Sequence, residues 1–345
     1  MLAWRVHGFG EPQDELVLEE VPAPTAADLA GMGMDLSGWV PLTAGQAPFA
    51  DWVLLEMTAA ALALPDVTMS RGTYPVPVRR PYTSGQEGVG VVVDTSPGRE
   101  GLLGKKVAAV CIQPWGSLAS TSVGVSTIFE VPAGMSDEEG AAFVIPAHTA
   151  YHAVHRRGRV QAGEVVVVLG AAGGLGSAIV QLCVAAGARV IAVVGGADKV
   201  AFCRELGAEA LDHGEGDVVA EVRELTDGRG VDVLVDPVQG EAGTSMRGAL
   251  RPDGRHVLCG HAGGLVPHDP HFYMRNHTLV GATLGGYPRD EMRRIHEETH
   301  AALDVLLASG RYRPLVTRCV AFSEVPAAVA DLAARRTMGR VVVRI

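Results

Sequence analysis

Lysine and cysteine are both scarce in this sequence. Lysine occurs only at Lys105, Lys106 and Lys199, so arginine supplies almost every other positive charge. The five cysteines are odd in number and widely separated, and no two of them form a C-x-x-C pair. Neither a disulfide framework nor a thiolate metal cluster is therefore indicated, and free thiols in a reducing cytoplasm fit best. We expect a cytoplasmic protein.

The sequence also has no surplus of positive charge. Its 29 lysines and arginines stand against 39 aspartates and glutamates, which gives a formal net charge of -10. A nucleic acid or an anionic membrane surface would need the opposite balance, so we expect neither as a partner. The first residues, Met1 to His7, show no basic region followed by an apolar core, so no secretory signal is expected.

One long run without charge raises the question of a membrane span. No side chain from residue 165 to residue 188 is charged, and such a run is long enough to cross a bilayer. Four glycines lie between positions 170 and 176, and a helix through them would lose roughly 1 kcal/mol at each. We therefore expect no membrane span but a short buried strand at 165–169, a tight turn, and a helix with one apolar face.

The alternation of strand and helix continues to about residue 283. Beyond the helix that ends at Gly187, apolar strands are expected at 190–194, near Leu211, and at 231–236, 255–259 and 278–283. Helices are expected between them at 197–206, 217–225 and 240–250. Strands that are apolar throughout and alternate with helices indicate a parallel sheet covered on both faces.

The segments on either side of this sheet have a different character. Residues 1 to about 135 carry short strands broken by proline and glycine, such as 52–58, 88–94 and 106–111, which indicates a mostly-β domain. The C-terminal part, with expected helices at 291–308 and 325–334 and strands at 315–322 and 339–345, can rejoin that domain. The irregular segment from Thr25 to Ala50 is either a surface loop or an active-site lid.

The glycine-rich turn lies where a dinucleotide would bind. The run Leu169-Gly-Ala-Ala-Gly-Gly-Leu-Gly176 stands between the end of a strand and the start of a helix. A pyrophosphate binds at such a place to backbone N–H groups and to the positive end of the helix. Ala171 replaces the first glycine of the usual G-x-G-x-x-G pattern, and a purely structural tight turn is the alternative interpretation.

The end of the second strand indicates which nicotinamide cofactor fits. NAD enzymes place an acidic residue there to accept a hydrogen bond from the ribose 2'-hydroxyl, whereas this sequence has Val194-Gly195-Gly196. Lys199, one turn further on, can neutralise a 2'-phosphate, so we expect NADPH. An exposed, solvated lysine is the alternative, and NAD would be preferred if Asp198 points inward.

Several segments together match the motifs of one enzyme family. They are the run 170–182, Gly195 with Lys199, Asp236-Pro-Val-Gln-Gly-Glu241 and Gly339-Arg-Val-Val. In addition, Arg71-Gly-Thr-Tyr74-Pro75 is similar to an R-x-G-x-Y-P segment, and residues 85–92 are similar to a G-x-E-x-x-G-x-V strand. With these motifs the chain resembles the medium-chain dehydrogenase/reductase superfamily, in its quinone oxidoreductase branch, over nearly its whole length except Thr25 to Ala50.

The resemblance implies an α/β protein with two domains. A GroES-like, mostly-β catalytic domain would comprise residues 1–143 and 284–345, and a Rossmann domain with a doubly wound parallel sheet would comprise residues 144–283. It also implies a homodimer, which an apolar edge strand at 278–283 fits. The cofactor-binding residues that it implies are Gly170, Ala172, Gly173, Gly174, Leu175, Gly176, Gly195, Lys199, His213, Val238, Cys259 and Arg340.

The resemblance also identifies the positions at which zinc would bind. Alcohol dehydrogenases of this superfamily hold a catalytic zinc through a cysteine, the histidine of a G-H-E triplet, and a second cysteine or a glutamate. The corresponding positions here are Ala63, Gln86 and Ile145, and the remaining Glu87 cannot hold a metal alone. The four clustered cysteines of a structural zinc lobe are missing as well, so we expect no metal and a zinc-independent reductase.

The expected chemistry follows from the expected absence of zinc. Without a Lewis acid, hydride addition to an activated C=C bond or a quinone is easier than alcohol oxidation, because it needs only positioning and a weak proton source. The resemblance therefore implies NADPH-dependent reduction of a small enone, enoyl compound or quinone. Tyr74 falls where the branch has a substrate-facing tyrosine, and Thr68 where some members have another. The asparagine that many quinone reductases carry is Ala63 here, so quinone is only one of the options.

Histidines supply the other catalytic and metal candidates. His261 follows the strand at 255–259 and can donate a proton to the product, and a histidine held by hydrogen bonds in a loop is the alternative. Three histidines have helical spacing, and five more share a loop region, but neither set has the pattern of a zinc site. The two sets are His148, His152 and His155, and His256, His261, His268, His271 and His277.

Two rival functions stay open at this stage. One is a nucleotide-binding protein without turnover, which the missing asparagine at Ala63 supports. The other is an enzyme similar to alcohol dehydrogenases, which the missing zinc ligands disfavour. Both would keep the same fold and the same glycine-rich turn, so only cofactor binding and turnover distinguish them.

Overall fold

Two sets of chain segments form separate units in the computed structural model, which describes residues 1–31, 51–75, 78–111, 113–265 and 271–345. The first unit comprises Met1–Ile145, Pro288–Arg293 and Pro314–Ile345, and the second comprises Pro146–Tyr287 and Arg294–Arg313. The domain boundaries that the resemblance implies stay a prediction, and residues 294–313 group with the second unit. The physical reason is that this helical segment buries His296, Thr299 and His300 against side chains of the second unit.

The second unit contains a six-stranded parallel sheet in the order β10-β9-β8-β11-β12-β13. The central strands β8 and β11 are buried along their whole length, because both of their faces are covered. The parallel sheet of the Rossmann type that the sequence predicts is confirmed. Its strands are β8 (Val165–Leu169), β9 (Arg189–Val194), β10 (Glu209–Asp212), β11 (Val231–Asp236), β12 (Leu250–Leu258) and β13 (Thr278–Gly281).

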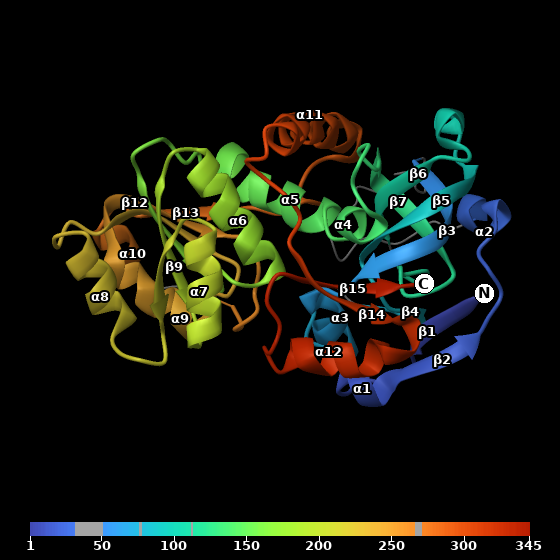
Figure 1. Cartoon of the computed structure of the whole chain (residues 1–345), viewed down its shortest axis with the longest axis horizontal. Coiled ribbons are helices and arrows are strands. Elements are labelled where there is room, and N and C mark those ends of the chain that lie inside the picture. Colours follow the sequence, from blue (N-terminus) through green and yellow to red (C-terminus); the bar gives the residue numbers. More distant parts are fainter. Residues whose placement is uncertain (32–50, 76–77, 112, 266–270) are drawn as a thin grey trace. The chain divides into compact units, whose positions relative to one another are not determined.

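Helices connect and cover these strands, as Figure 1 shows. The strands β8, β9 and β11 and the helices α6 and α7 lie within one or two residues of the ranges that the hydrophobic pattern predicts. The helices are α5 (Val144–Tyr151), which continues as a π-helix at His152–Arg157, α6 (Gly174–Ala185), α7 (Ala197–Glu205), α8 (Val218–Leu225), α9 (Gly240–Met246), α10 (His271–Met274) and α11 (Arg289–Ala308).

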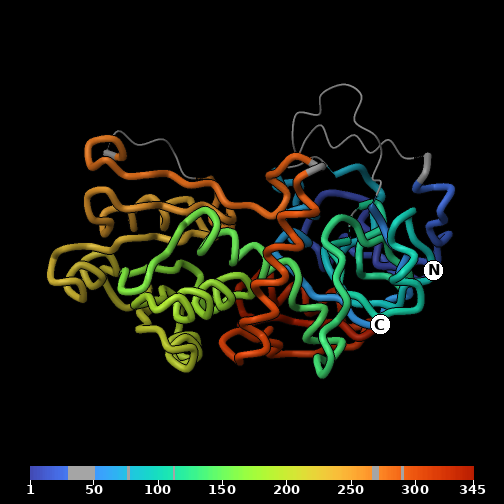
Figure 2. Tube along the Cα trace, turned by 90° about the horizontal axis from the view of Figure 1, so that it is seen from above, coloured from blue at the N-terminus to red at the C-terminus, as the bar shows by residue number. Residues whose placement is uncertain are grey.

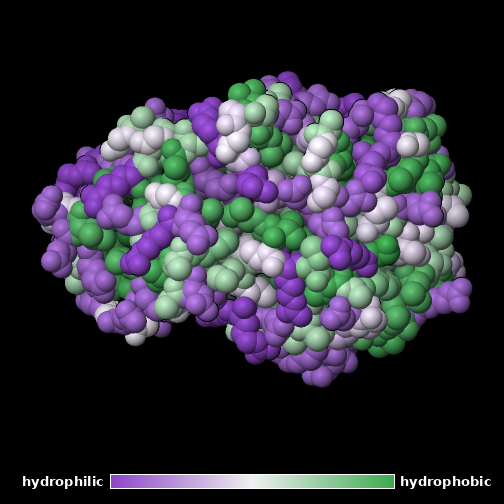
Figure 3. Space-filling view, in the orientation of Figure 1, coloured by the Kyte–Doolittle hydropathy of each residue, from purple (hydrophilic) through white to green (hydrophobic). Residues whose placement is uncertain are grey.

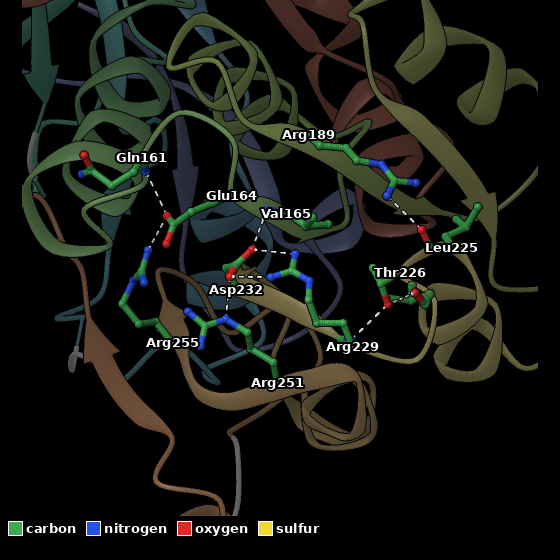
Figure 4. Close-up of polar contacts among 12 residues, drawn as sticks. Gln161, Glu164, Val165, Arg189, Leu225, Thr226, Arg229, Asp232, Arg251 and Arg255 are labelled. Carbon is green, nitrogen blue, oxygen red and sulfur yellow. Dashed lines mark hydrogen bonds and ion pairs between the residues drawn. The ribbon is translucent and has the colours of Figure 1, made fainter.

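The amino ends of the parallel strands are tied together by arginines and acids. Asp232 accepts hydrogen bonds from the Val165 N–H at 2.7 Å and from Arg251 Nε at 2.5 Å, and Arg229 also contacts it (Figure 4). Burial alone would raise the pKa of Asp232, but the hydrogen bonds from Val165, Arg251 and Arg229 outweigh it and lower this pKa. These contacts hold β8 against β11 at the edge opposite to the loops that follow the strands.

The first unit is built around a small barrel. Strand β3 pairs with β5 on one side and β7 on the other, so β3, β5, β6 and β7 close on themselves. Apolar side chains such as Leu55, Val92 and Ile128 fill the interior. The barrel strands are β3 (Trp52–Ala61), β5 (Glu87–Thr95), β6 (Lys106–Cys111) and β7 (Thr121–Glu130).

Both ends of the chain add strands and helices to this unit, and Figure 2 shows the blue and red segments there. Strand β15 lies between β14 and β3, so the C-terminal segment completes the sheet. The second core packs Trp4, Tyr82 and Val343 against helix α12. Including those from between and after the barrel strands, the remaining strands and helices of this unit are β1 (Leu2–Val6), β2 (Leu16–Glu20), β4 (Tyr82–Thr83), β14 (Val316–Ala321), β15 (Arg340–Arg344), α1 (Pro12–Glu15), α2 (Ala26–Gly31), α3 (Leu64–Ser70), α4 (Asp137–Ala141) and α12 (Val325–Ala333).

The surface carries mixed polar and apolar residues. Figure 3 shows hydrophilic residues spread over the visible face between smaller groups of hydrophobic ones. Among the described residues, no helix has both the length and the apolar character needed to cross a membrane. Of the segment Thr25 to Ala50, only the part that contains α2 is described, and residues 32–50 lie outside the described ranges, so both interpretations of this segment stay predictions.

Candidate functional site

The order of the parallel strands defines one place in the second unit where a ligand can bind. From β8 the chain builds the sheet outward through β9 and β10, and then returns to add β11, β12 and β13 on the other side. In such open sheets ligands bind beyond the carboxyl ends of the strands at the point of reversal. The loops that follow β8, β9, β11 and β12 are therefore the candidate site.

The loop after β8 permits a very close approach of helix α6. Gly170 has a φ of +57°, which favours glycine, and Gly173 caps the helix in an extended conformation. A Cβ atom at Gly176 would lie 2.1 Å from the Gly170 carbonyl oxygen and 2.8 Å from Ala171 Cα, so only glycine fits there. The unpaired N–H groups of the first turn of α6 thus face the loop, which is the geometry for binding a pyrophosphate.

Ala171 does not disturb this turn. Its side chain is fully buried, and its backbone N–H lies 3.4 Å from the Val193 carbonyl oxygen on β9. The alanine side chain is therefore accommodated inside the protein, and the turn keeps its bond to β9.

The loops after β9 and β10 form the second part of the site. Asp212, the last residue of β10, accepts hydrogen bonds from the Gly196 N–H at 2.8 Å and from the Gly214 N–H at 2.9 Å, one on each carboxylate oxygen. His213 covers Gly195, because a Cβ there would lie 2.8 Å from His213 Nε2. Lys199 is half-buried in the first turn of α7, whereas Asp198 beside it is exposed.

The loops after β11 and β12 form the third part, and the first of them contacts the glycine-rich loop. A Cβ at Gly170 would lie 3.1 Å from Val238 Cγ2, so the predicted cofactor residues on β8 and β11 are neighbours. The two loops bond to each other through Gly263 N–H to the Val238 carbonyl oxygen at 2.7 Å. Cys259 and His261 lie on the second of these loops, and burial lowers the pKa of His261.

Gln239 on the first of these loops has an unusual backbone. Its φ of 59° and ψ of -146° are rare for a residue with a side chain, and such conformations cost of order 1–3 kcal/mol. Its N–H donates to Asp236 Oδ1 at 2.6 Å, and its side-chain amide donates to the Gly260 carbonyl oxygen. The site thus keeps a strained loop beside the Val238 side chain, and no sequence pattern predicts that strain.

Tyr74, the predicted substrate-facing residue, lies in the first unit after helix α3. Its N–H donates to the Thr68 carbonyl oxygen at 3.1 Å, and its ring packs against the core that contains Trp4 and Tyr82. Burial, with a smaller contribution from the charge of Asp66, raises the pKa of Tyr74 to about 12. The phenol therefore keeps its proton at neutral pH and can donate a hydrogen bond.

The positions at which the superfamily binds catalytic zinc hold side chains that do not fit this metal. The Gln86 amide nitrogen lies 3.5 Å from Met69 Sδ, and Ala63 and Ile145 have no ligating atom in their side chains. Within the ranges that the structure describes, no group of three or more His, Cys, Asp or Glu side chains is arranged to hold a metal ion. These residues therefore do not fit a catalytic zinc.

A buried acid and a buried arginine, Glu87 and Arg340, lie beside these zinc positions. Glu87 pairs with the Arg340 guanidinium and accepts a hydrogen bond from the Ile145 N–H at 2.7 Å. Burial raises the pKa of Glu87 to about 7, although the charge of Arg340 opposes this shift. Arg340, which the resemblance places among the cofactor residues, is thus held by an acid of the first unit, and its role toward a cofactor stays a prediction.

Asp66 is a second buried acid near this pair, and sequence reasoning missed it. It accepts hydrogen bonds from the Ala63 and Gly85 N–H groups, both at 2.8 Å, and from the Ser84 hydroxyl. Burial raises the pKa of Asp66 although these hydrogen bonds oppose the shift. The available signal was the position of Asp66 directly after Pro65. An acid at the third position of a helix caps its start.

The helical histidine set is buried but does not form a metal site in the described part of the chain. His148 stacks on His300 with ring centroids 5.4 Å apart, and His152 lies 3.2 Å from the Thr299 hydroxyl. Burial lowers the pKa of His152 to about 4. His155 stands apart from them against Tyr151, and of the second set His268 lies outside the described residues.

Comparison with known proteins connects both units to one superfamily. A family model described as zinc-binding dehydrogenase matches residues 174–301, and one described as alcohol dehydrogenase GroES-like domain matches residues 50–125. The chain is 26% identical over 296 residues to a quinone oxidoreductase-like protein 2 homolog of Nematostella vectensis, over 84% of this chain and 81% of that protein.

A second kind of relative is much longer. The chain is 32% identical over 215 residues to a highly reducing polyketide synthase of Talaromyces stipitatus, over 61% of this chain and 8% of the synthase. The chain thus spans less than a tenth of that protein, so the activity of the whole synthase does not transfer to it.

Solved structures match over the whole chain. A probable oxidoreductase of Mycobacterium abscessus is 30% identical with a TM-score of 0.81, over 100% of this chain and 99% of the other. A mycobacterial protein complexed with NADPH is 25% identical with a TM-score of 0.83, over 100% of both chains.

Two glycine substitutions distinguish a glycine that the fold requires from a glycine that ligand binding requires. We expect Gly176→Ala to destabilise the second unit by about 3 kcal/mol, because the methyl group would meet backbone atoms that cannot move aside. Gly173→Ala places its methyl group 3.4 Å from the Gly170 carbonyl oxygen, an ordinary contact, so stability should change by less than about 0.5 kcal/mol while dinucleotide binding weakens. Thermal unfolding and equilibrium dialysis measure the two effects, and equal stability of the two variants would contradict this account.

Arg340 and Glu87 give a prediction about pH. Because the folded pKa of Glu87, about 7, lies above its ordinary value of 4.5, its contribution to stability is fully present below 4.5 and is lost as pH rises through 7. In Arg340→Met no cation opposes the buried carboxylate, so the loss of stability relative to the parent should be constant below about pH 6 and grow as pH rises through 7, by about 2 kcal/mol at about pH 8.5. Arg344→Met, which removes an exposed pair with Glu138, is the matched control and should change little at either pH. A loss that does not vary with pH would show that Glu87 does not titrate in this range.

Proposed function

The chain belongs to the medium-chain dehydrogenase/reductase superfamily, in its quinone oxidoreductase branch, and on this premise we propose that it reduces small activated substrates with NADPH. The substrate class is an α,β-unsaturated carbonyl compound or a quinone, and zinc takes no part. The names of the relatives support a reductive activity, since they include quinone oxidoreductase-like proteins and a highly reducing polyketide synthase.

The preference for NADPH is carried by one observation. Gly195 and Gly196 follow β9 where an NAD enzyme has an acid, and Asp212 at the end of β10 accepts the N–H groups of Gly196 and Gly214, one on each oxygen. The residues that end β9, Val194-Gly195-Gly196, therefore offer no acid to accept a hydrogen bond from the ribose 2'-hydroxyl that distinguishes NAD. Lys199 and His213 stand at the same loops, and an ammonium and an imidazole are both able to bind a 2'-phosphate.

The residues of the second unit would hold the rest of the cofactor. The N–H groups of residues 174–176 would bind the pyrophosphate, while the Gly173 N–H donates to the Gly170 carbonyl oxygen at 3.0 Å, and Val238 and Cys259 would border the nicotinamide. When bound, the cofactor supplies the hydride. Because the loop after β11 bonds to the loop after β12 and packs against the glycine-rich loop, these residues are positioned before any ligand arrives, which is one way in which a protein speeds such a transfer.

The substrate-side residues would supply a hydrogen bond and a proton. Tyr74, whose phenol stays protonated, would donate a hydrogen bond to the carbonyl or quinone oxygen as negative charge develops there. His261 is the proposed proton donor, and water is the alternative source. Both roles follow from the residue types and the resemblance, and a test of each single variant distinguishes them.

We also propose that the enzyme contains no metal, forms a homodimer and is located in the cytoplasm. Alanine, glutamine and isoleucine stand at the zinc positions, so purified protein should contain no stoichiometric zinc, and retained zinc would overturn this part. Strand β13 ends the parallel sheet, and its Leu279 is half exposed, which supports pairing with a second copy. Sedimentation that shows only particles of 36.0 kDa would contradict the dimer.

The cofactor assignment is tested by replacing Lys199. Lys199→Gln should weaken NADPH binding by about tenfold and leave NADH binding unchanged, because only NADPH carries the 2'-phosphate that the ammonium neutralises. Lys105→Gln is the matched control, since Lys105 pairs with Glu130 on the first unit and should affect neither cofactor. Titration by fluorescence gives both affinities. Equal binding of NADH and NADPH by the parent protein would sink the assignment.

Turnover is tested with a panel of enones, enoyl esters and quinones, followed by the loss of NADPH absorbance. Tyr74→Phe should lower kcat/KM by about 10²-fold, as expected when a donor to a developing oxyanion is removed, and should leave NADPH affinity unchanged. Measurable NADPH affinity without turnover of any substrate would favour a binding protein. Alcohol-dependent reduction of NADP⁺ would favour an activity like that of alcohol dehydrogenases.

A further inference from the structure

Three buried polar side chains form a continuous row in the second unit. His256 Nε2 lies 2.8 Å from Asp236 Oδ2, and Arg247 Nε lies 3.2 Å from His256 Nδ1. Asp236 and His256 are fully buried, and Arg247 is 7% exposed. Such groups are costly to remove from water, so a row that runs from the end of α9 to the end of β11 calls for an explanation.

The direction of the hydrogen bonds in this row is fixed by chemistry. A guanidinium can only donate, so the Nδ1 atom of His256 accepts the hydrogen bond from Arg247. The proton of the imidazole therefore lies on Nε2 and is donated to the Asp236 carboxylate. Arg247 thereby sets the tautomer of His256, and His256 in turn occupies one oxygen of Asp236.

The other oxygen of Asp236 holds the loop that follows β11. Asp236 Oδ1 accepts the N–H groups of Val238 at 2.8 Å and of Gln239 at 2.6 Å, and so keeps Gln239 in its rare conformation. Gln239 then donates from its side chain to the Gly260 carbonyl oxygen on the loop that follows β12. The row thus ends on the two loops that carry Val238, Cys259 and His261.

We propose that Asp236, His256 and Arg247 are positioning residues that set the loops after β11 and β12 for the nicotinamide ring and the hydride transfer. This inference rests on the proposed function, because it concerns the nicotinamide end of the same site. The hydrogen bonds of the row lead to the loops after β11 and β12, whereas Lys199 and the glycine-rich loop lie outside the row. We therefore expect the row to affect the nicotinamide end of the cofactor.

Substitution at the far end of the row gives the sharpest test. Arg247→Met should lower kcat and the single-turnover rate of hydride transfer by about tenfold, since small displacements of a reacting group have effects of this size. The affinity for 2',5'-ADP, which has the 2'-phosphate but no nicotinamide, should stay the same. The emission of bound NADPH, which reports on the nicotinamide, should shift toward that of free NADPH.

Conservative variants distinguish positioning from a merely structural role. Arg247→Lys keeps a hydrogen-bond donor, and His256→Gln keeps both a donor and an acceptor, so both variants should retain most of the rate of hydride transfer. His256→Leu removes both and should lose most of that rate. Arg223→Met is the matched control, because Arg223 donates to Gly248 in the same turn but lies outside the row. Variants that unfold at lower temperature but keep the parent rate and emission would overturn the inference.

Different results would contradict the proposed function and the positioning role of Asp236, His256 and Arg247. If the parent protein binds neither 2',5'-ADP nor NADPH, the proposed function is wrong and the inference falls with it. If the parent binds both and reduces a substrate while Arg247→Met and His256→Leu behave like the parent, only the inference is wrong.

Discussion

The contact of helix α6 with the loop after β8 is the constraint on which the second unit depends. At Gly176 the helix approaches the Gly170 carbonyl so closely that no side chain fits, and this approach aims the first turn of the helix at the reversal point of the sheet. The neighbouring loops then arrange around it, with Val238 against Gly170 and His213 over Gly195. A single missing methyl group therefore determines where a cofactor can bind.

Buried acids have different roles at the two edges of the parallel sheet. At the amino ends, Asp232 is satisfied by partly exposed arginines and holds strands together. At the carboxyl ends, Asp236 is satisfied inside the protein and holds loops in an otherwise unfavourable conformation. The first kind of contact stabilises the fold, and the second keeps a site in place before a ligand binds, at some cost in stability.

Local patterns in the sequence predicted most of the second unit. The apolar runs at β8, β9 and β11 and the spacing in α6 depend on residues next to one another, so periodicity finds them. Strands β1, β2 and β4 were missed because they are short and partly polar. The pairs Glu87 with Arg340, Asp236 with His256, and His148 with His300 were missed for another reason: each joins residues far apart in the chain, and a single sequence carries no signal of such proximity.

The insertion of one unit within the other has a consequence for biosynthesis. Strand β3 precedes the second unit in the chain, whereas its neighbour β15 follows it, so the sheet of the first unit keeps an open edge until β15 has been synthesised. The strands of the second unit all lie between residues 165 and 281 and can pair before that moment. The nascent chain therefore passes through a state in which the parallel sheet of the second unit is complete and the sheet of the first unit is not, and in that state a bound cofactor can stabilise the parallel sheet.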